Sequence, residues 1–183
     1  MNPPPALRRT DRSLGDEQCR ALLERGFSGH LATFGADGWP YVVPLLYVLV
    51  DDVLMVHNAR STGHLRLNVE HLARACFEVT ETGHVFEYGR YECDTSVSYD
   101  SVIAFGRIRL IEERALKSRF CDGLMSKYTS RDSGRPKNFF PRLDAIAVYA
   151  MTLDRLTGKS NPLPDIAERW PDLDRTRTPN AHP

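Results

Sequence analysis

The chain has 183 residues, a length typical of one domain with a buried core. Its 24 Lys and Arg residues balance 24 Asp and Glu residues, so the formal net charge at pH 7 is zero. A general nucleic-acid-binding protein usually carries an excess of basic residues, so the charge argues against that class and leaves open only a local anion site.

The predicted elements are mostly strands joined by short turns. After a flexible N-terminal arm at residues 1–12, helices are predicted at residues 13–26, 62–72 and 112–128. Strands are predicted at residues 28–34, 40–50, 53–58, 74–80, 85–88, 97–111 and 145–156. The domain is therefore placed at residues 13–157, and residues 158–183, rich in Pro, Asp, Arg and Thr, are predicted to be an irregular tail. Hairpins and meanders favour a mainly β fold, an antiparallel barrel, closed or split, with a few covering helices.

Nothing in the sequence predicts a membrane segment or an exported protein. The longest apolar run, Tyr41–Val50, has ten residues and includes Pro44, which is too short to span a bilayer. The N-terminal sequence MNPPPALRRTDRS lacks the apolar core of a signal peptide. We therefore expect a cytoplasmic protein without a membrane partner.

The cysteines and histidines do not predict a metal centre. The four cysteines are widely spaced and include no C-x-x-C pair, so Cys76 and Cys121 are expected to be small apolar residues on buried faces. His57, His64 and His71 recur every seven residues, which on one helix corresponds to about 10 Å of rise, too far to share one ion. Fingerprints for nicotinamide dinucleotides, nucleoside triphosphates and serine hydrolases are also missing.

The densest polar stretch is HNARSTGHLR, residues 57–66, which follows an apolar run at residues 53–56. A strand end that turns into a helix start offers free amides and the positive end of the helix dipole to an anion such as phosphate. The side chains that could add hydrogen bonds there are those of Arg60, Ser61, Thr62, His64 and Arg66. An alternative is equally compatible with these ten residues: a hydroxyl caps the helix and the arginines are simply solvated.

Several motifs recur in a fixed order along the chain. They are GHLAT at 29–33, DGWP at 37–40, VPL at 43–45, HNA at 57–59, CFEV at 76–79 and YDSVI at 99–103. Together they resemble the pyridoxamine 5'-phosphate oxidase-like flavoproteins, nearest the branch that contains the nitroimidazole-resistance flavoproteins. The resemblance covers about residues 29–128, with 146–156 as a closing strand. It implies a six-stranded antiparallel split β-barrel that forms a homodimer and binds FMN in a groove at the dimer interface.

The resemblance also assigns residues to the flavin. Thr33 should lie near the flavin, and Pro44 and Leu45 should lie against the ring edge, where backbone amides reach its polar atoms. The HNA motif should run along the flavin toward the phosphate, and HNARSTGHLR would be the phosphate cradle. The residues implied by the resemblance are Thr33, Pro44, Leu45, His57, Asn58 and Ala59, with Tyr99 and Ser101 contributed by the partner chain.

The loop departs from the family pattern at the phosphate. Many relatives carry G-x-K after H-x-A, and the lysine binds the phosphate. The matching residues here are Gly63-His64-Leu65, in a loop one residue longer. Because Leu65 carries no charge, Arg60, His64 or Arg66 has to compensate, or FMN binding is weakened or lost.

Each assigned residue also has a structural alternative. Thr33 could belong to the core, Pro44 could mark a strand edge or bulge, His57 could be a satisfied interior histidine, and Tyr99 could be ordinary barrel packing. The segment Phe139-Phe140-Pro141-Arg142 either covers the flavin or the dimer interface, or is a plain hydrophobic anchor.

Three functions stay open. The first is an FMN-dependent reductase or oxidase acting on a small molecule such as a nitroaromatic, with His57 as a candidate proton donor or acceptor. The second is a non-catalytic flavin-binding or storage protein. The third is a barrel of the same shape that binds a deazaflavin, or haem with His30, His57 or His64 as axial ligand. Oxidation of pyridoxamine phosphate itself is not expected, because the arginines of the C-terminal tail form no clear second phosphate cradle.

Overall fold

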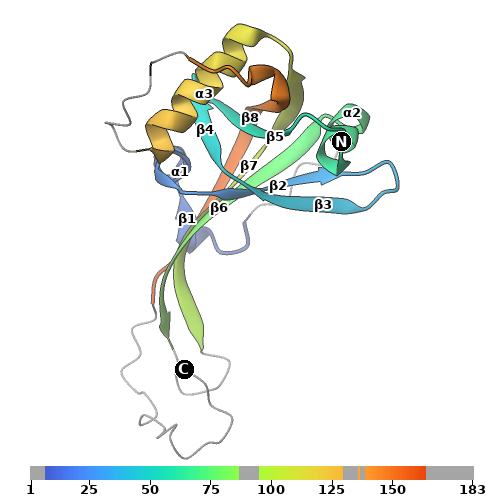
Figure 1. Ribbon diagram of the computed structural model, residues 1–183. Helices are drawn as coiled ribbons and strands as arrows, with labels where there is room; N and C mark the ends of the chain where they lie inside the picture. Colours follow the sequence, from blue (N-terminus) through green and yellow to red (C-terminus); the bar gives the residue numbers. More distant parts are fainter. Residues whose placement is uncertain (1–6, 87–94, 130–135, 137–138, 164–183) are drawn as a thin grey trace, which may run out of the picture.

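The computed structural model describes residues 7–86, 95–129, 136 and 139–163 (Figure 1). A curled antiparallel sheet has the strand order β3-β2-β6-β7-β8-β5-β4, with β1 paired to β8. Its strands are β1 (Ser13–Leu14), β2 (Gly29–Phe34), β3 (Pro40–Leu45), β4 (Tyr47–Val50), β5 (Val53–Ala59), β6 (Arg74–Phe86), β7 (Ser96–Ile111) and β8 (Ile146–Asn161). The helices are α1 (Asp16–Arg25), α2 (His64–His71) and α3 (Arg114–Tyr128), with short 3-10 turns at Thr10–Arg12 and Leu143–Ala145.

The mainly β split-barrel fold is confirmed, although the structure describes eight strands where the resemblance implied a six-stranded barrel. One reason is that the predicted strand at residues 40–50 is interrupted at Leu46. β3 pairs with β2, whereas β4 pairs with β5, and these two pairs lie at opposite ends of the strand order. The interruption at Leu46 therefore separates the two edge strands and marks the place where the barrel is split.

The predicted domain boundary at residue 157 falls inside β8, which continues to Asn161. Both β1 and β7 pair with this end of β8, with Leu14 opposite Gly158 and Tyr99 opposite Asn161. A Cβ atom at Gly158 would collide with the Cys19 sulfur and with Leu14, so glycine allows this close approach. The remainder of the predicted tail, 164–183, and the first six residues of the predicted arm lie outside the described residues.

The alternation of side chains along β5 and β8 divides the core into two clusters. The inner cluster fills the barrel and includes Leu22, Leu31, Leu54, Val56, Phe77 and Tyr149. The outer cluster lies between the sheet and α3 and includes Val48, Met55, Ile111, Phe120 and Val148. Neighbouring residues of β5 therefore face different environments, which matters for the HNA motif at the end of this strand.

The C-terminal end of α3 is fixed to β4 by aromatic and polar contacts. The Tyr128 hydroxyl lies 2.7 Å from the Phe27 carbonyl oxygen, to which it donates, and it accepts a hydrogen bond from the Tyr47 amide at 3.2 Å. The Lys127 ammonium lies 3.7 Å from the centre of the Tyr47 ring, a cation–π contact, and it is buried without a hydrogen-bond partner among the described residues. Burial lowers the pKa of Lys127 to about 8.

This lysine should make stability depend on pH. Unfolding returns Lys127 toward its ordinary pKa of 10.5, so between about pH 8 and 10.5 the unfolded chain binds more protons and the free energy of unfolding rises with pH. Above about pH 10 the raised pKa of the buried Tyr47 acts in the opposite direction. We expect Lys127→Met to flatten the rise in urea-unfolding free energy between pH 8 and 10, whereas Lys159→Met on β8 should not. An equal rise in all three proteins would contradict the assignment.

Candidate functional site

The predicted phosphate loop lies between the end of β5 and the start of α2. Ser61 and Thr62 are exposed, and Gly63 is the N-terminal capping residue of α2. The helix start has neither a side-chain cap nor an acidic residue in its first turn. An added Cβ atom at Gly63 would meet nothing within 4 Å, so the space beside Gly63 is open. The helix start is therefore compatible with an anion, and no hydroxyl caps it as the alternative required.

α2 is fixed to the β2–β3 hairpin at two points. The Asn68 side-chain amide donates to the Thr33 hydroxyl at 3.1 Å, and both side chains are buried. The His64 ring stacks on the Tyr41 ring, with centroids 5.2 Å apart and planes 17° apart. Leu65 points into the inner core, so it cannot replace the phosphate-binding lysine of the relatives. Thr33 thus occupies the core position that was its structural alternative.

The contact between Thr33 and Asn68 should show strong coupling. Thr33→Val removes the acceptor and leaves a buried amide unpaired, which costs about 1–3 kcal/mol of unfolding free energy. In the double variant Thr33→Val/Asn68→Leu both polar groups are gone, so the loss should be smaller than the sum of the two single losses. Urea unfolding of the four proteins tests this, and strictly additive losses would show that the hydrogen bond does not hold α2 on the sheet.

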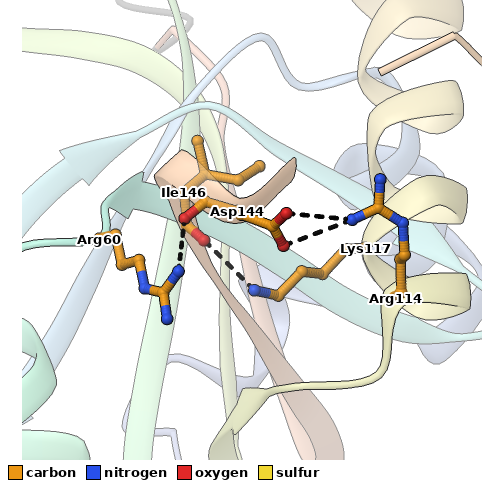
Figure 2. A network of polar contacts seen from close by, with 5 residues as sticks. All are labelled: Arg60, Arg114, Lys117, Asp144 and Ile146. Atoms are coloured by element: carbon orange, nitrogen blue, oxygen red, sulfur yellow. Dashed lines mark hydrogen bonds and ion pairs between the residues drawn. The ribbon is translucent and has the colours of Figure 1, made fainter. Parts of the chain in front are cut away.

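Both arginines of the loop are engaged by exposed contacts on the chain itself. The Arg60 guanidinium donates to the Asp144 carbonyl oxygen at 2.8 Å (Figure 2). The Arg60 amide donates to the Ala145 carbonyl oxygen at 3.2 Å. The Arg66 guanidinium donates to the Glu70 carboxylate at 2.9 Å, one turn along α2. Exposed contacts of this kind contribute little free energy, so a bound phosphate could compete for either guanidinium.

The HNA motif presents its side chains to both faces of β5. His57 belongs to the outer face, where its ring centre lies 5.2 Å from that of Phe120. Asn58 belongs to the inner face, beside Tyr149. His57 Nδ1, Asn58 Oδ1 and the Tyr149 hydroxyl are all buried without a well-formed hydrogen bond among the described residues. Burial lowers the pKa of His57 and raises the pKa of Tyr149, an effect that the Asn58 side chain partly offsets.

The predicted ring-edge residues lie on β3. Pro44 pairs with His30 and faces outward, whereas Leu45 pairs with Gly29 and faces the barrel. β3 is the last strand in the order and pairs only with β2, so the backbone groups on its other side have no strand partner in the described structure. Such an edge can offer hydrogen bonds to a ligand or to a second chain.

Tyr99 and Ser101 lie at the opposite end of the sheet from the loop. His57 pairs with Val148 of β8, and Tyr99 pairs with Asn161, which is 13 residues further along the same strand. At about 3.3 Å per residue, the separation along β8 is roughly 40 Å. Tyr99 contributes to a polar hollow of about 300 Å³. The two residues can therefore meet the loop only if they come from another copy of the chain.

A cavity of about 390 Å³ lies between the sheet and α3. It is lined by His57, Phe120, Cys121, Leu124, Met125, Ile146 and residues 140–143. The sequence singled out His57 and the aromatic segment that includes Phe140 and Pro141, but it gave no sign that they meet. Their proximity depends on the packing of α3 and on the turn before β8, which no local motif encodes.

A protein-only metal centre is not found in the described part of the chain. No three His, Cys, Asp or Glu side chains come together there in a way that could hold an ion. Cys76 and Cys121 are half-buried. Of the helices that the structure describes, none is long and apolar enough to cross a membrane.

The family model described as pyridoxamine 5'-phosphate oxidase matches residues 15–160. No curated protein matches the chain. Among solved structures, flavocytochrome Anf3 from Azotobacter vinelandii has a TM-score of 0.75 and 20% identity, over 96% of this chain and 79% of that one. The FAD and haem binding protein from Mycobacterium smegmatis has a TM-score of 0.70 and 24% identity, over 85% and 76%. A protein named for 5-nitroimidazole antibiotic resistance, from Bacteroides thetaiotaomicron, has a TM-score of 0.66 and 19% identity, over 81% and 86%. At these identities the likeness shows the fold.

Proposed function

The chain belongs to the pyridoxamine 5'-phosphate oxidase family, and from that premise we propose that it is a flavin-binding redox protein that holds FMN. The observation that supports this most is the open, uncapped start of α2 directly after β5. A phosphate group there would accept hydrogen bonds from the first helix amides, where the helix dipole also favours negative charge. The Ser61 and Thr62 hydroxyls are exposed beside it and can donate as well.

The positive charge for the phosphate has to come from the arginines or from His64. Arg60 precedes the open helix start and Arg66 lies in its first turn, so both are within the segment that would surround a phosphate. His64 is exposed at the helix start and is held by its stacking on Tyr41. These residues replace the lysine that many relatives carry, since Leu65 is buried.

The free edge of β3 would border the flavin ring, with Pro44 and Leu45 near the ring edge. The backbone of His57–Ala59, rather than the His57 imidazole, would run along the flavin, because that imidazole lies on the α3 face. When bound, FMN supplies hydride or electron transfer. The chain holds the ring, orients it and leaves a face open to a small organic substrate. Bleaching of the bound flavin by NADH would separate this reductase or oxidase from a non-catalytic carrier.

The phosphate cradle is tested by comparing two ligands. Charge-assisted hydrogen bonds contribute about 1.5–3 kcal/mol each, so Arg60→Ala/Arg66→Ala should weaken FMN binding by about tenfold or more. Riboflavin lacks the phosphate, and its affinity should not change. Fluorescence titration of both ligands measures this.

A matched control removes two arginines elsewhere. In Arg20→Ala/Arg119→Ala the lost side chains pair with Asp52 and Asp51, away from the loop. This control should bind FMN as the parent protein does. Unchanged FMN affinity in Arg60→Ala/Arg66→Ala, or equal weakening of FMN and riboflavin, would overturn the cradle.

The site is proposed to be completed by a second copy of the chain. The outward face of the β2–β3 hairpin is apolar, with Phe34 49% exposed and Val42 57% exposed, and Trp39 of the turn is 74% exposed. An exposed apolar patch of this kind is typical of an interface. The partner subunit would bring its Tyr99 and Ser101 to the flavin, since those of the same chain are too far along β8.

Sedimentation velocity tests the dimer. We expect the parent protein to sediment as a dimer and Val42→Asp to shift it toward monomer with loss of retained FMN, because a carboxylate would be buried in the interface. Ala21→Asp, on the exposed side of α1, is the matched control and should remain dimeric. A monomeric parent protein that still binds FMN would contradict the shared site.

Haem binding is a second candidate function, and one observation favours it. The His57 imidazole lines an apolar cavity and makes no hydrogen bond to any residue that the structure describes. Two proteins of similar structure are named as a flavocytochrome and as an FAD and haem binding protein. Haem would then be bound in addition to the flavin.

A further inference from the structure

The cavity between β5, β8 and α3 has the size and chemistry of a ligand site. Its volume of about 390 Å³ lies within the range of pockets that bind small molecules. Its walls are mostly apolar, with Leu124 and Met125 from α3, Ile146 from β8 and Phe140 and Pro141 from the segment before β8. A flat hydrophobic group would bury its faces against such walls.

His57 is the imidazole in this wall, and its position is fixed. The pairing of His57 with Val148 sets its backbone, and the Phe120 ring packs beside its ring at 5.2 Å with a tilt of 50°. His57 Nδ1 is buried without a hydrogen bond to any described residue, and the ring lines the cavity, where a neutral imidazole nitrogen is a common metal ligand. Burial also lowers the His57 pKa, which favours the neutral imidazole that a metal requires.

One cation, Arg142, lines the cavity beside the turn that leads into β8. It forms no ion pair with any described residue. Figure 2 shows three more cations around the start of β8: Arg60 on the Asp144 carbonyl, Lys117 on the Ile146 carbonyl at 3.3 Å, and Arg114 on the Asp144 carboxylate at 3.3 Å. Only Arg114 of these pairs with a carboxylate, whereas Arg60 and Lys117 donate to backbone carbonyl oxygens near the start of β8. Carboxylates of a ligand that emerged at this end would be favoured there.

From these three observations we propose that haem binds in this cavity with His57 as its axial ligand and its propionates toward Arg142. The proposal rests on haem binding as the second candidate function and assigns the site. It places haem on the α3 face of β5 and the FMN phosphate beyond the end of that strand, so one chain can hold both. The other two histidines considered as axial ligands do not line this cavity. The His30 side chain is 55% exposed beside Glu78, and His64 is exposed and stacked on Tyr41.

Hemin titration of the full-length protein, already loaded with FMN, tests the site. We expect about one haem per chain with a sharp Soret band, and His57→Ala should lower haem affinity by about tenfold or more. Added imidazole should restore the Soret band of His57→Ala, because it can enter the space that the side chain has left. FMN retention should be the same in both proteins. His30→Ala is the matched histidine control and should bind haem as the parent does.

A second variant tests the cavity while the His57 side chain is kept. Leu124→Trp should fill the cavity and exclude haem while His57 stays in place, and circular dichroism shows whether it folds. Undiminished haem binding in both His57→Ala and Leu124→Trp would place the haem elsewhere and overturn the site, with haem binding still standing. Absence of haem binding by the parent protein would overturn both the site and the second candidate function, and would leave the flavin proposal untouched.

Discussion

The antiparallel pairing of β5 with β8 is the constraint on which the rest of the structure depends. It places Leu54 opposite Met151 and Ala59 opposite Ile146, and so it fixes which side chains of β5 enter the barrel. The next residues leave the sheet and begin α2, so the open helix start lies at the end of a rigid strand. The same pairing turns His57 toward α3 and Asn58 toward Tyr149. Both proposed cofactor sites follow from this single register, one on the α3 face of the strand and the other at the helix start beyond its end.

The split between β3 and β4 explains why the flavin site is incomplete in one chain. A barrel closed by its own hydrogen bonds would have no free edge, whereas here β3 has a strand partner on one side only within the described structure. The apolar face of the hairpin lies on the outside of that edge and includes Phe34 and Val42. An open edge beside an exposed apolar face is compatible with a second copy of the chain, and a ligand enclosed between the two copies would be shielded from water.

The sequence predicted much of the fold but could not predict how the site residues are oriented. The spacing of apolar residues and the turn residues were sufficient to predict the helices and most strands. The loop at residues 57–66 was found because its polar residues follow an apolar run. That run, Val53–Val56, is apolar at every position, so it carried no information on whether His57 faces inward or outward. The contact of Arg60 with Asp144 joins segments more than eighty residues apart, and the cavity is formed by α3 and the chain before β8. Such contacts depend on tertiary packing and leave no local pattern.

The central claim is that the open start of α2 after β5 holds the phosphate of a flavin. The most direct measurement is the visible absorption spectrum of the purified protein before and after FMN is added and unbound ligand is removed by desalting. We expect a flavin spectrum that survives desalting, with a stoichiometry of about one FMN per chain because two equivalent sites in a symmetric dimer share the interface. A protein that retains no flavin after desalting would contradict the account and would show that the arginines and His64 do not replace the missing lysine.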